Sequence, residues 1–184
     1  MEPNKSHCVL CFQVVEAHWK AVLLPPLVPA ADQVVAVFVT WKKHGKLRGC
    51  IGSLTALPHP QCVVEFALKS ALQDSRFPQI TLAELEHCTV GVSFLLGFES
   101  GLNWDEWEVG MHGIILRFQH YRAVFLPEVA VERRWSKLDT IKNLVKKTGF
   151  QGEVDLELLS SISIERFTSC KHEASYAECK DLFV

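Results

Sequence analysis

The sequence predicts an α+β fold in which a mainly antiparallel sheet is flanked by helices. The expected strands and helices do not alternate regularly along the chain, which argues against a doubly wound sheet. Several expected strands follow one another through short turns, as in hairpins. The 184 residues are 48% hydrophobic and 22% charged, which provides ample apolar material for a core. We therefore expect one folded domain over residues 1–184.

The elements are expected from hydrophobic periodicity and from residues that begin or end helices. Apolar residues recur at spacings of three and four over residues 6–22, which indicates an amphipathic helix. A proline-rich connector covers residues 23–33, and residues 34–41 are apolar at nearly every position, as in an inner strand that is covered on both faces. The further expected elements are a second hairpin arm over 47–54, a helix from Pro60 to about 73, a short helix over 82–86, strands over 89–96, 113–118 and 123–126, a helix between Ser136 and Gly149, and a short helix and strand over 154–160 and 162–167.

Charge and hydropathy exclude several classes of protein. Nineteen Lys and Arg against twenty-one Asp and Glu give a net charge of −2, so no overall field attracts nucleic acid or an anionic membrane. No apolar stretch approaches the roughly 18 residues of a membrane span, and the N-terminus lacks the pattern of a signal peptide. We expect an intracellular protein, cytoplasmic or nuclear, whose seven cysteines are thiols.

The segment Leu47–Gly52 carries the most informative candidate residues. In a strand, the period of two would place Arg48 and Cys50 on the same face. A nearby guanidinium favours a thiolate, and flanking glycines would leave the sulfur open to a ligand. The alternative is that Gly49 and Gly52 relieve crowding or form a bulge, and that Cys50 is a small buried hydrophobe.

Five motifs in order make the whole chain resemble the AMMECR domain family. The motifs are LRGCIGS at 47–53, SALQDSRFP at 70–78, WEVGMHGI at 107–114, FLPEVA at 125–130 and SYAE at 175–178. The resemblance implies a single AMMECR domain with a smaller lobe and with the LRGCIG segment in a cleft. It also implies an enzyme system, because microbial relatives accompany Memo-like and radical-SAM proteins, but it defines no reaction.

The resemblance carries over a set of candidate site residues. Cys50 would act as nucleophile, His112 as base, and Glu128 or Glu108 as the orienting carboxylate. Each residue also has a structural explanation, such as capping, pairing of Arg76 with Asp74, or a backbone hydrogen bond at His112. The residues expected to bind the ligand are Arg48, Gly49, Gly52, Asp74, Ser75, Arg76 and Glu108.

These residues support two functional hypotheses from different classes. The first is an enzyme, or a subunit of an enzyme system, that acts on a small anionic or carbonyl ligand through Cys50. The second is a non-catalytic adaptor or ligand-binding domain that engages a protein partner. We expect no metal, because Cys8 and Cys11 form a single C-x-x-C on an amphipathic helix and are expected to be core thiols. We expect no cofactor, because the sequence has no phosphate-binding G-x-x-x-x-G-K-[ST] and no dinucleotide-binding G-x-G-x-x-G.

Overall fold

The computed structural model describes residues 1–23 and 33–183, so most of the expected proline-rich connector lies outside the described residues. The α+β prediction is confirmed. A six-stranded sheet has the order β2-β1-β3-β6-β4-β5, and β1 pairs antiparallel with both neighbours, as does β4. In chain order the elements are α1 (Lys5–Lys20), β1 (Val34–Lys43), β2 (Lys46–Pro58), α2 (Gln61–Leu72), the 3-10 helix η1 (Leu82–His87), β3 (Cys88–Leu102), β4 (Gly113–Phe118), β5 (Tyr121–Phe125), α3 (Pro127–Arg133), α4 (Lys137–Lys147), α5 (Leu156–Ser161), β6 (Ser163–Ser175), α6 (Tyr176–Cys179) and η2 (Lys180–Leu182).

The chain divides into two compact units. Unit 1 comprises Met1–Leu95 and Cys170–Val184, and unit 2 comprises Leu96–Ser169. The strands β3 and β6 contribute residues to both units. The expectation of one domain over residues 1–184 stays a prediction.

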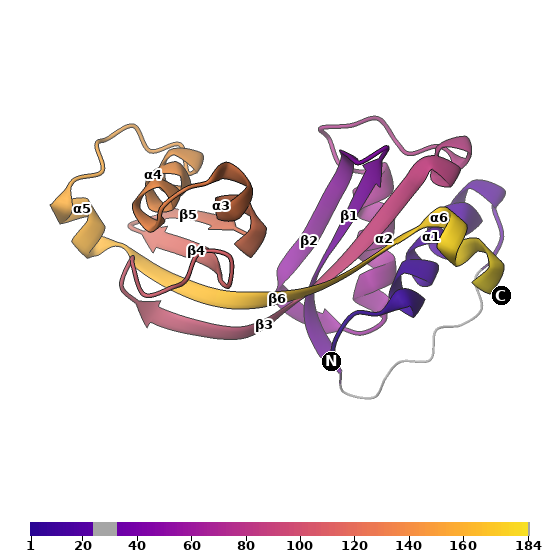
Figure 1. Cartoon of the computed structure of the whole chain (residues 1–184), viewed down its shortest axis with the longest axis horizontal. Coiled ribbons are helices and arrows are strands. Elements are labelled where there is room, and N and C mark those ends of the chain that lie inside the picture. Colours follow the sequence, from indigo (N-terminus) through magenta and orange to yellow (C-terminus); the bar gives the residue numbers. More distant parts are fainter. Residues whose placement is uncertain (24–32, 184) are drawn as a thin grey trace. The chain divides into compact units, whose positions relative to one another are not determined.

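One face of the sheet in unit 1 is covered by α1 and α2 (Figure 1). Alternate residues of β1 point into this core, and Val37, Val39 and Trp41 are fully buried. The indole N–H of Trp41 donates to the Ser70 hydroxyl of α2 at 3.0 Å. The expected inner strand is therefore present, but the expected burial of both its faces is wrong, because helices cover one face and Thr40 on the other face is partly exposed.

Unit 2 packs α3 and α4 against the β4–β5 hairpin (Figure 1). Its core contains Trp107, Leu116 and Ile141, each 2% exposed or less. The helix α4 begins as expected, because Ser136 and Asp139 form a capping box in which each side chain accepts the other's backbone N–H.

The last strand is the largest difference from the sequence prediction. A strand was expected over residues 162–167, whereas β6 continues to Ser175. Its second half carries Lys171 and Glu173, whose charges hide the alternation that normally reveals a strand. The continuation brings the C-terminal segment into unit 1, where Cys179 is fully buried.

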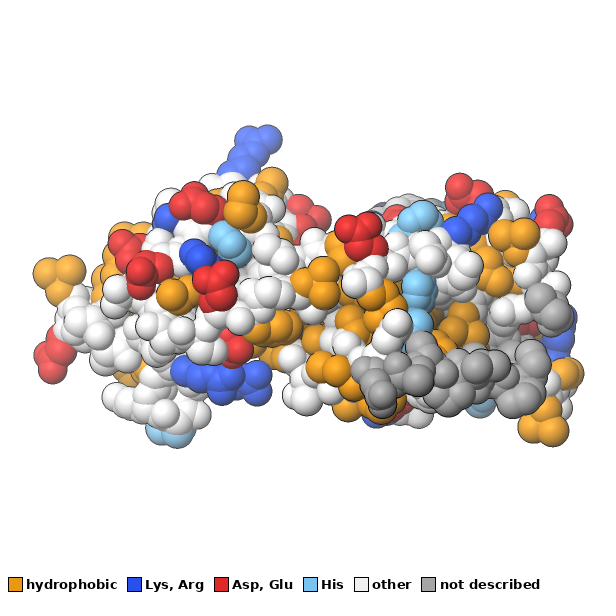
Figure 2. Space-filling model, turned by 90° about the horizontal axis from the view of Figure 1, so that it is seen from below, with side chains coloured by type: hydrophobic (Ala, Val, Ile, Leu, Met, Phe, Trp, Pro, Cys, Tyr) orange, Lys and Arg blue, Asp and Glu red, His pale blue; other side chains and the backbone are white. Residues whose placement is uncertain are grey.

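The surface of the chain mixes both signs of charge. Figure 2 shows basic, acidic and apolar side chains interspersed on the visible face. Among the helices described, none is long and apolar enough to cross a bilayer.

Candidate functional site

Cys50 lies in the middle of β2, directly opposite Thr40 of β1. Directly opposed residues of antiparallel strands place their side chains on the same face of the sheet. The Cys50 Sγ lies 3.1 Å from the Thr40 Oγ1, and both residues are partly exposed. The thiol therefore lies on the sheet face opposite α1 and α2, and the alternative of a fully buried Cys50 is wrong.

The loop after α2 holds the backbone of Cys50 on both sides. The Asp74 Oδ2 accepts the Cys50 N–H at 2.9 Å, and the Arg76 Nη2 donates to the Cys50 carbonyl at 3.0 Å. Asp74 and Arg76 are themselves joined by two charge-assisted hydrogen bonds, Nε to Oδ1 at 2.9 Å and Nη2 to Oδ2 at 2.6 Å. Asp74, Arg76 and the Cys50 peptide groups thus form one network, which we call the Cys50 clamp.

The clamp sets the charges beside the thiol. Hydrogen bonds from Arg76, from the Cys50 N–H and from the Arg76 N–H hold the pKa of the Asp74 carboxyl well below its usual range, against the effect of burial. The bond to Asp74 raises the pKa of Arg76 against the effect of burial, and the electrostatic interaction with Cys50 raises it further. The Asp74 side chain is 6% exposed and that of Arg76 is 56% exposed, so the carboxylate is internal and the guanidinium faces solvent.

The sequence correctly predicted the pairing of Arg76 with Asp74 but placed Arg48 wrongly. The register of β1 and β2 shifts between Trp41 and Lys42, where Trp41 faces Gly49 and Lys42 faces Leu47. Arg48 is therefore the extra residue of a β-bulge, and the period of two does not hold there.

The Arg48 side chain forms hydrogen bonds within unit 1. It donates to Glu84 at 3.3 and 3.1 Å and to the backbone carbonyls of Pro78 and Gln79. Burial opposes ionisation of Glu84, but hydrogen bonds from Thr81, from Lys43 and from Arg48 lower its pKa to about 2. Arg48 thus fixes η1 and the loop before it, and Arg76 is the arginine that contacts Cys50.

The glycines of the motif are required by packing. A Cβ on Gly49 would run into the Ser70 carbonyl oxygen of α2, and a Cβ on Gly52 would meet the Val37 carbonyl and the Phe38 ring. The structural explanation for Gly49 and Gly52 is therefore confirmed, and it accounts for both positions without a ligand.

The remaining predicted residues are divided between the units. Ser75 is an exposed residue of the turn between Asp74 and Arg76 in unit 1. Glu108, His112 and Glu128 belong to unit 2, so their predicted roles at Cys50 stay predictions.

Local contacts explain the geometry of these unit 2 residues. The His112 Nδ1 accepts the Glu108 N–H at 3.0 Å, the backbone contact expected as one alternative. Burial and the charge of Arg166 lower the pKa of His112. Glu128 lies in the first turn of α3, where a carboxylate is favoured by the helix dipole.

Sequence reasoning missed Thr40 and the charged residues of β6. Thr40 could have been found by extending the predicted hairpin register outward from its turn, allowing for the bulge. Lys171 and Glu173 belong to the part of β6 that was left unassigned, and no local pattern connects them with Cys50.

Comparison with known proteins places this fold in a family. The sequence model of the AMMECR1 family matches residues 8–172. The chain belongs to the AMMECR1 family. An uncharacterized protein of Arabidopsis thaliana is 35% identical over 95% of the chain and 86% of its own length. An uncharacterized protein of Schizosaccharomyces pombe is 31% identical over 95% of the chain and 94% of its own length.

A solved structure supports the fold assignment. The crystal structure of the uncharacterized protein PH0010 from Pyrococcus horikoshii superimposes with a TM-score of 0.79. It is 26% identical in sequence, and the match covers 95% of this chain and 92% of that one. The fold of this AMMECR1 chain is thus shared with PH0010, and the names of these similar proteins state no activity.

The C-x-x-C of this AMMECR1 chain lies in the core of unit 1. Cys8 and Cys11 are fully buried on α1, as expected of core thiols. Burial, followed by the neighbouring Cys179, raises the pKa of Cys8 to about 12, and that of Cys11 is also raised. Within residues 1–23 and 33–183, no three His, Cys, Asp or Glu side chains gather in a way that could hold a metal ion.

Proposed function

We propose that unit 1 binds a small anionic or carbonyl compound at the Cys50 clamp and that the Cys50 thiolate is the nucleophile. The arrangement of Arg76 carries this proposal. Its Nε and Nη2 are committed to Asp74 and to the Cys50 carbonyl, whereas its Nη1 has no hydrogen-bond partner among the described residues. A guanidinium fixed in this way offers a pre-oriented donor to a ligand beside the thiol.

The chemistry follows from the charges present. A cation next to a cysteine favours the thiolate, which is the nucleophilic form. Attack on a carbonyl carbon would form a C–S bond and move the C=O π electron pair onto oxygen, and the Nη1 of Arg76 would donate to that oxygen. Thr40, 3.1 Å from the sulfur, would hold the thiolate in position.

Site-specific alkylation tests this role. We would measure the rate at which iodoacetamide modifies Cys50 over a pH series, using peptide mapping to separate it from the other cysteines. We expect Cys50 at pH 7 to react at least tenfold faster than a free thiol of ordinary pKa, and the rate to fall severalfold in Arg76→Gln. A Cys50 no more reactive than the free thiol, or a rate that Arg76→Gln leaves unchanged, would refute the nucleophile.

A non-catalytic adaptor or ligand-binding domain is the second candidate. The contacts of Arg48 favour it, because a motif arginine engaged with Glu84 and two carbonyls serves the fold. If the domain is a non-catalytic adaptor, the Cys50→Ser variant should retain all binding to partners or metabolites. Turnover abolished by Cys50→Ser would exclude it.

We place the protein in a reducing intracellular compartment, either the cytosol or the nucleus. The buried thiols Cys8, Cys11 and Cys62 support this placement, because they contribute to the core as thiols. Fluorescence microscopy of a tagged full-length chain is the direct measurement, and a signal confined to the secretory pathway would contradict it.

A further inference from the structure

The sheet face that carries Cys50 continues across β1 to β3 and β6. Thr40 lies between Cys50 of β2 and Gly91 of β3, so these three residues form one row across the sheet. Their side-chain directions share a face, because each pair is directly opposed. The space above Gly91 therefore belongs to the same surface as the thiol.

That space is occupied by a lysine from β6. A Cβ on Gly91 would collide with the Cε of Lys171, and the Lys171 Nζ would lie 3.2 Å from it. The absence of a side chain at Gly91 thus leaves room for the Lys171 side chain over β3. Alanine at this position would force the lysine to move.

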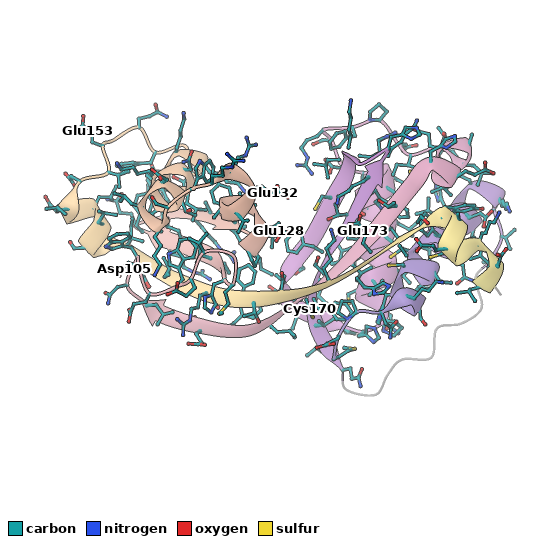
Figure 3. All side chains as sticks on the ribbon, viewed as in Figure 1. Asp105, Glu128, Glu132, Glu153, Cys170 and Glu173 are labelled. Carbon is teal, nitrogen blue, oxygen red and sulfur yellow. The ribbon has the colours of Figure 1, made fainter. Side chains whose placement is uncertain are left out.

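A second lysine, Lys42 of β1, contacts the same carboxylate as Lys171. Lys42 lies two residues after Thr40 on β1, and therefore on the same face. Its Nζ lies 3.1 Å from Glu173 Oε2, and the Lys171 Nζ lies 2.7 Å from the same oxygen. Glu173 is on β6 (Figure 3). Two ammonium groups and one carboxylate leave this cluster with a net charge of +1.

The cluster is accessible to solvent. The side chains of Lys42, Lys171 and Glu173 are 34%, 35% and 35% exposed. Partial exposure leaves N–H donors of both lysines available, because each ammonium has three donors and the carboxylate occupies only some of them. The lysines are held in place, and their charge is only partly neutralised.

We propose that Lys42 and Lys171 form an anion subsite on the face that carries Cys50. The Cys50 and Gly91 positions are two strands apart, which is roughly 10 Å at about 4.8 Å per strand. The ligand would therefore carry an anionic group, such as a carboxylate or a phosphate, roughly 10 Å from the atom that meets the thiol. This inference rests on the proposed role of Cys50 and specifies the ligand class of that site.

Charged thiol reagents test the subsite without a known substrate. Three methanethiosulfonates would be used, with a neutral methyl, an anionic sulfonatoethyl or a cationic trimethylammonioethyl group. In each case the thiolate attacks the sulfenyl sulfur, forms a disulfide and releases methanesulfinate. Rates at Cys50 would be measured by peptide mapping and normalised to 2-mercaptoethanol. We expect the anionic reagent to exceed the cationic one at least fivefold, with less preference in 0.5 M salt.

Substitutions that remove a positive or a negative charge test whether these residues form the anion subsite. The double variant Lys42→Gln/Lys171→Gln should reduce the ratio of anionic to cationic rates at least threefold. Glu173→Gln removes the neutralising carboxylate and should increase that ratio. Lys20→Gln removes another lysine paired with a glutamate, on α1 at the opposite face, and should leave the ratio unchanged. Circular dichroism would confirm that each variant is folded.

The outcomes separate the two proposals. If Cys50 reacts rapidly with the neutral reagent but the ratio is the same in the double variant, the anion subsite is wrong and the nucleophile stands. A ratio that falls in Glu173→Gln would also overturn the subsite. Slow modification of Cys50 by the neutral reagent overturns the nucleophile and, with it, this inference.

Discussion

The Asp74 carboxylate accepts the backbone N–H of Cys50 at 2.9 Å, joining the loop after α2 to the strand at the end of the sheet order. The outward N–H and C=O groups of a terminal strand have no neighbouring strand to pair with. At Cys50, side chains supply both partners, since Asp74 accepts the N–H and Arg76 donates to the carbonyl. The candidate nucleophile is therefore a residue whose backbone N–H and C=O are both held by side chains of the loop after α2.

Asp74→Asn should lower the free energy of unfolding by about 2 kcal/mol at pH 7, because a buried charged acceptor is lost. The pKa of Asp74 is lower in the folded state than in the unfolded state, so its contribution is present above about pH 4. That contribution disappears as pH falls towards the folded-state pKa. Urea unfolding from pH 7 to pH 2 should therefore show the two proteins converging in acid. Asp105→Asn, at an exposed position, should follow the wild type, and a constant gap across the range would contradict the assignment.

Substitutions of the two motif arginines should have different effects. Arg48→Ala should lower the free energy of unfolding by about 2 kcal/mol, since its bonds to Glu84 and to two carbonyls are lost. Arg76→Ala removes the bonds to Asp74 and to the Cys50 carbonyl, and it should reduce the alkylation rate of Cys50 more than Arg48→Ala does. Chemical denaturation and iodoacetamide kinetics on the same samples give both numbers. The reverse order in the alkylation rates would show that Arg48 is the arginine that acts on the thiol.

Gly49→Ala should destabilise unit 1 by about 3 kcal/mol or more, because the new methyl group collides with a backbone carbonyl of α2 that cannot rotate away. Gly45→Ala is the matched comparison. Gly45 has open space around it but a φ of +76°. The substitution should therefore lower the free energy of unfolding by only about 1 kcal/mol, through backbone strain. Guanidinium titrations would compare the two. Equal losses would mean that Gly49 is not held against α2.

Acidification should weaken unit 1 through a histidine pair. The Nε2 atoms of His7 and His59 lie 3.0 Å apart, which requires one protonated and one bare nitrogen. Burial and the charge of His59 lower the pKa of His7, and burial lowers that of His59. The unfolded chain therefore takes up protons first as pH falls below about 6.5, and stability should drop by about 1 kcal/mol between pH 7.5 and 5.5.

Two histidine substitutions test whether this pair is the source of the pH dependence. His59→Gln should flatten the pH dependence of the unfolding free energy over that window. His120→Gln removes an exposed histidine of the β4–β5 turn and should keep the wild-type slope. An unchanged slope in His59→Gln would exclude the pair as its source.

Much of the fold was predictable because its signals are local. The period of α1, the apolar run of β1 and the capping box at Ser136 each depend on residues within one element. The length of β6 was not predictable, since Glu173 forms an ion pair with Lys42 of β1 that has no counterpart in the local sequence, and Lys171 pairs with the same carboxylate.

The sequence predicted some members of the candidate site but not their arrangement. Cys50, Asp74 and Arg76 were all selected, and the structure joins them in one network. Arg48 was assigned to the thiol because strand alternation was assumed, and a bulge of one residue invalidated that assumption. The position of Thr40 beside Cys50 depends on the register of β1 and β2. Lys171 comes from β6, which is distant from Cys50 in the sequence.

Local signals were enough to predict the fold class, the family and the candidate cysteine, because periodicity and ordered motifs are properties of neighbouring residues. The arginine that contacts this cysteine, and the lysines on the same face of the sheet, became apparent in the three-dimensional structure. Those relationships depend on strand register, on the bulge at Arg48 and on the space left by Gly91, where Lys171 lies although it is 80 residues away in the sequence (91 to 171).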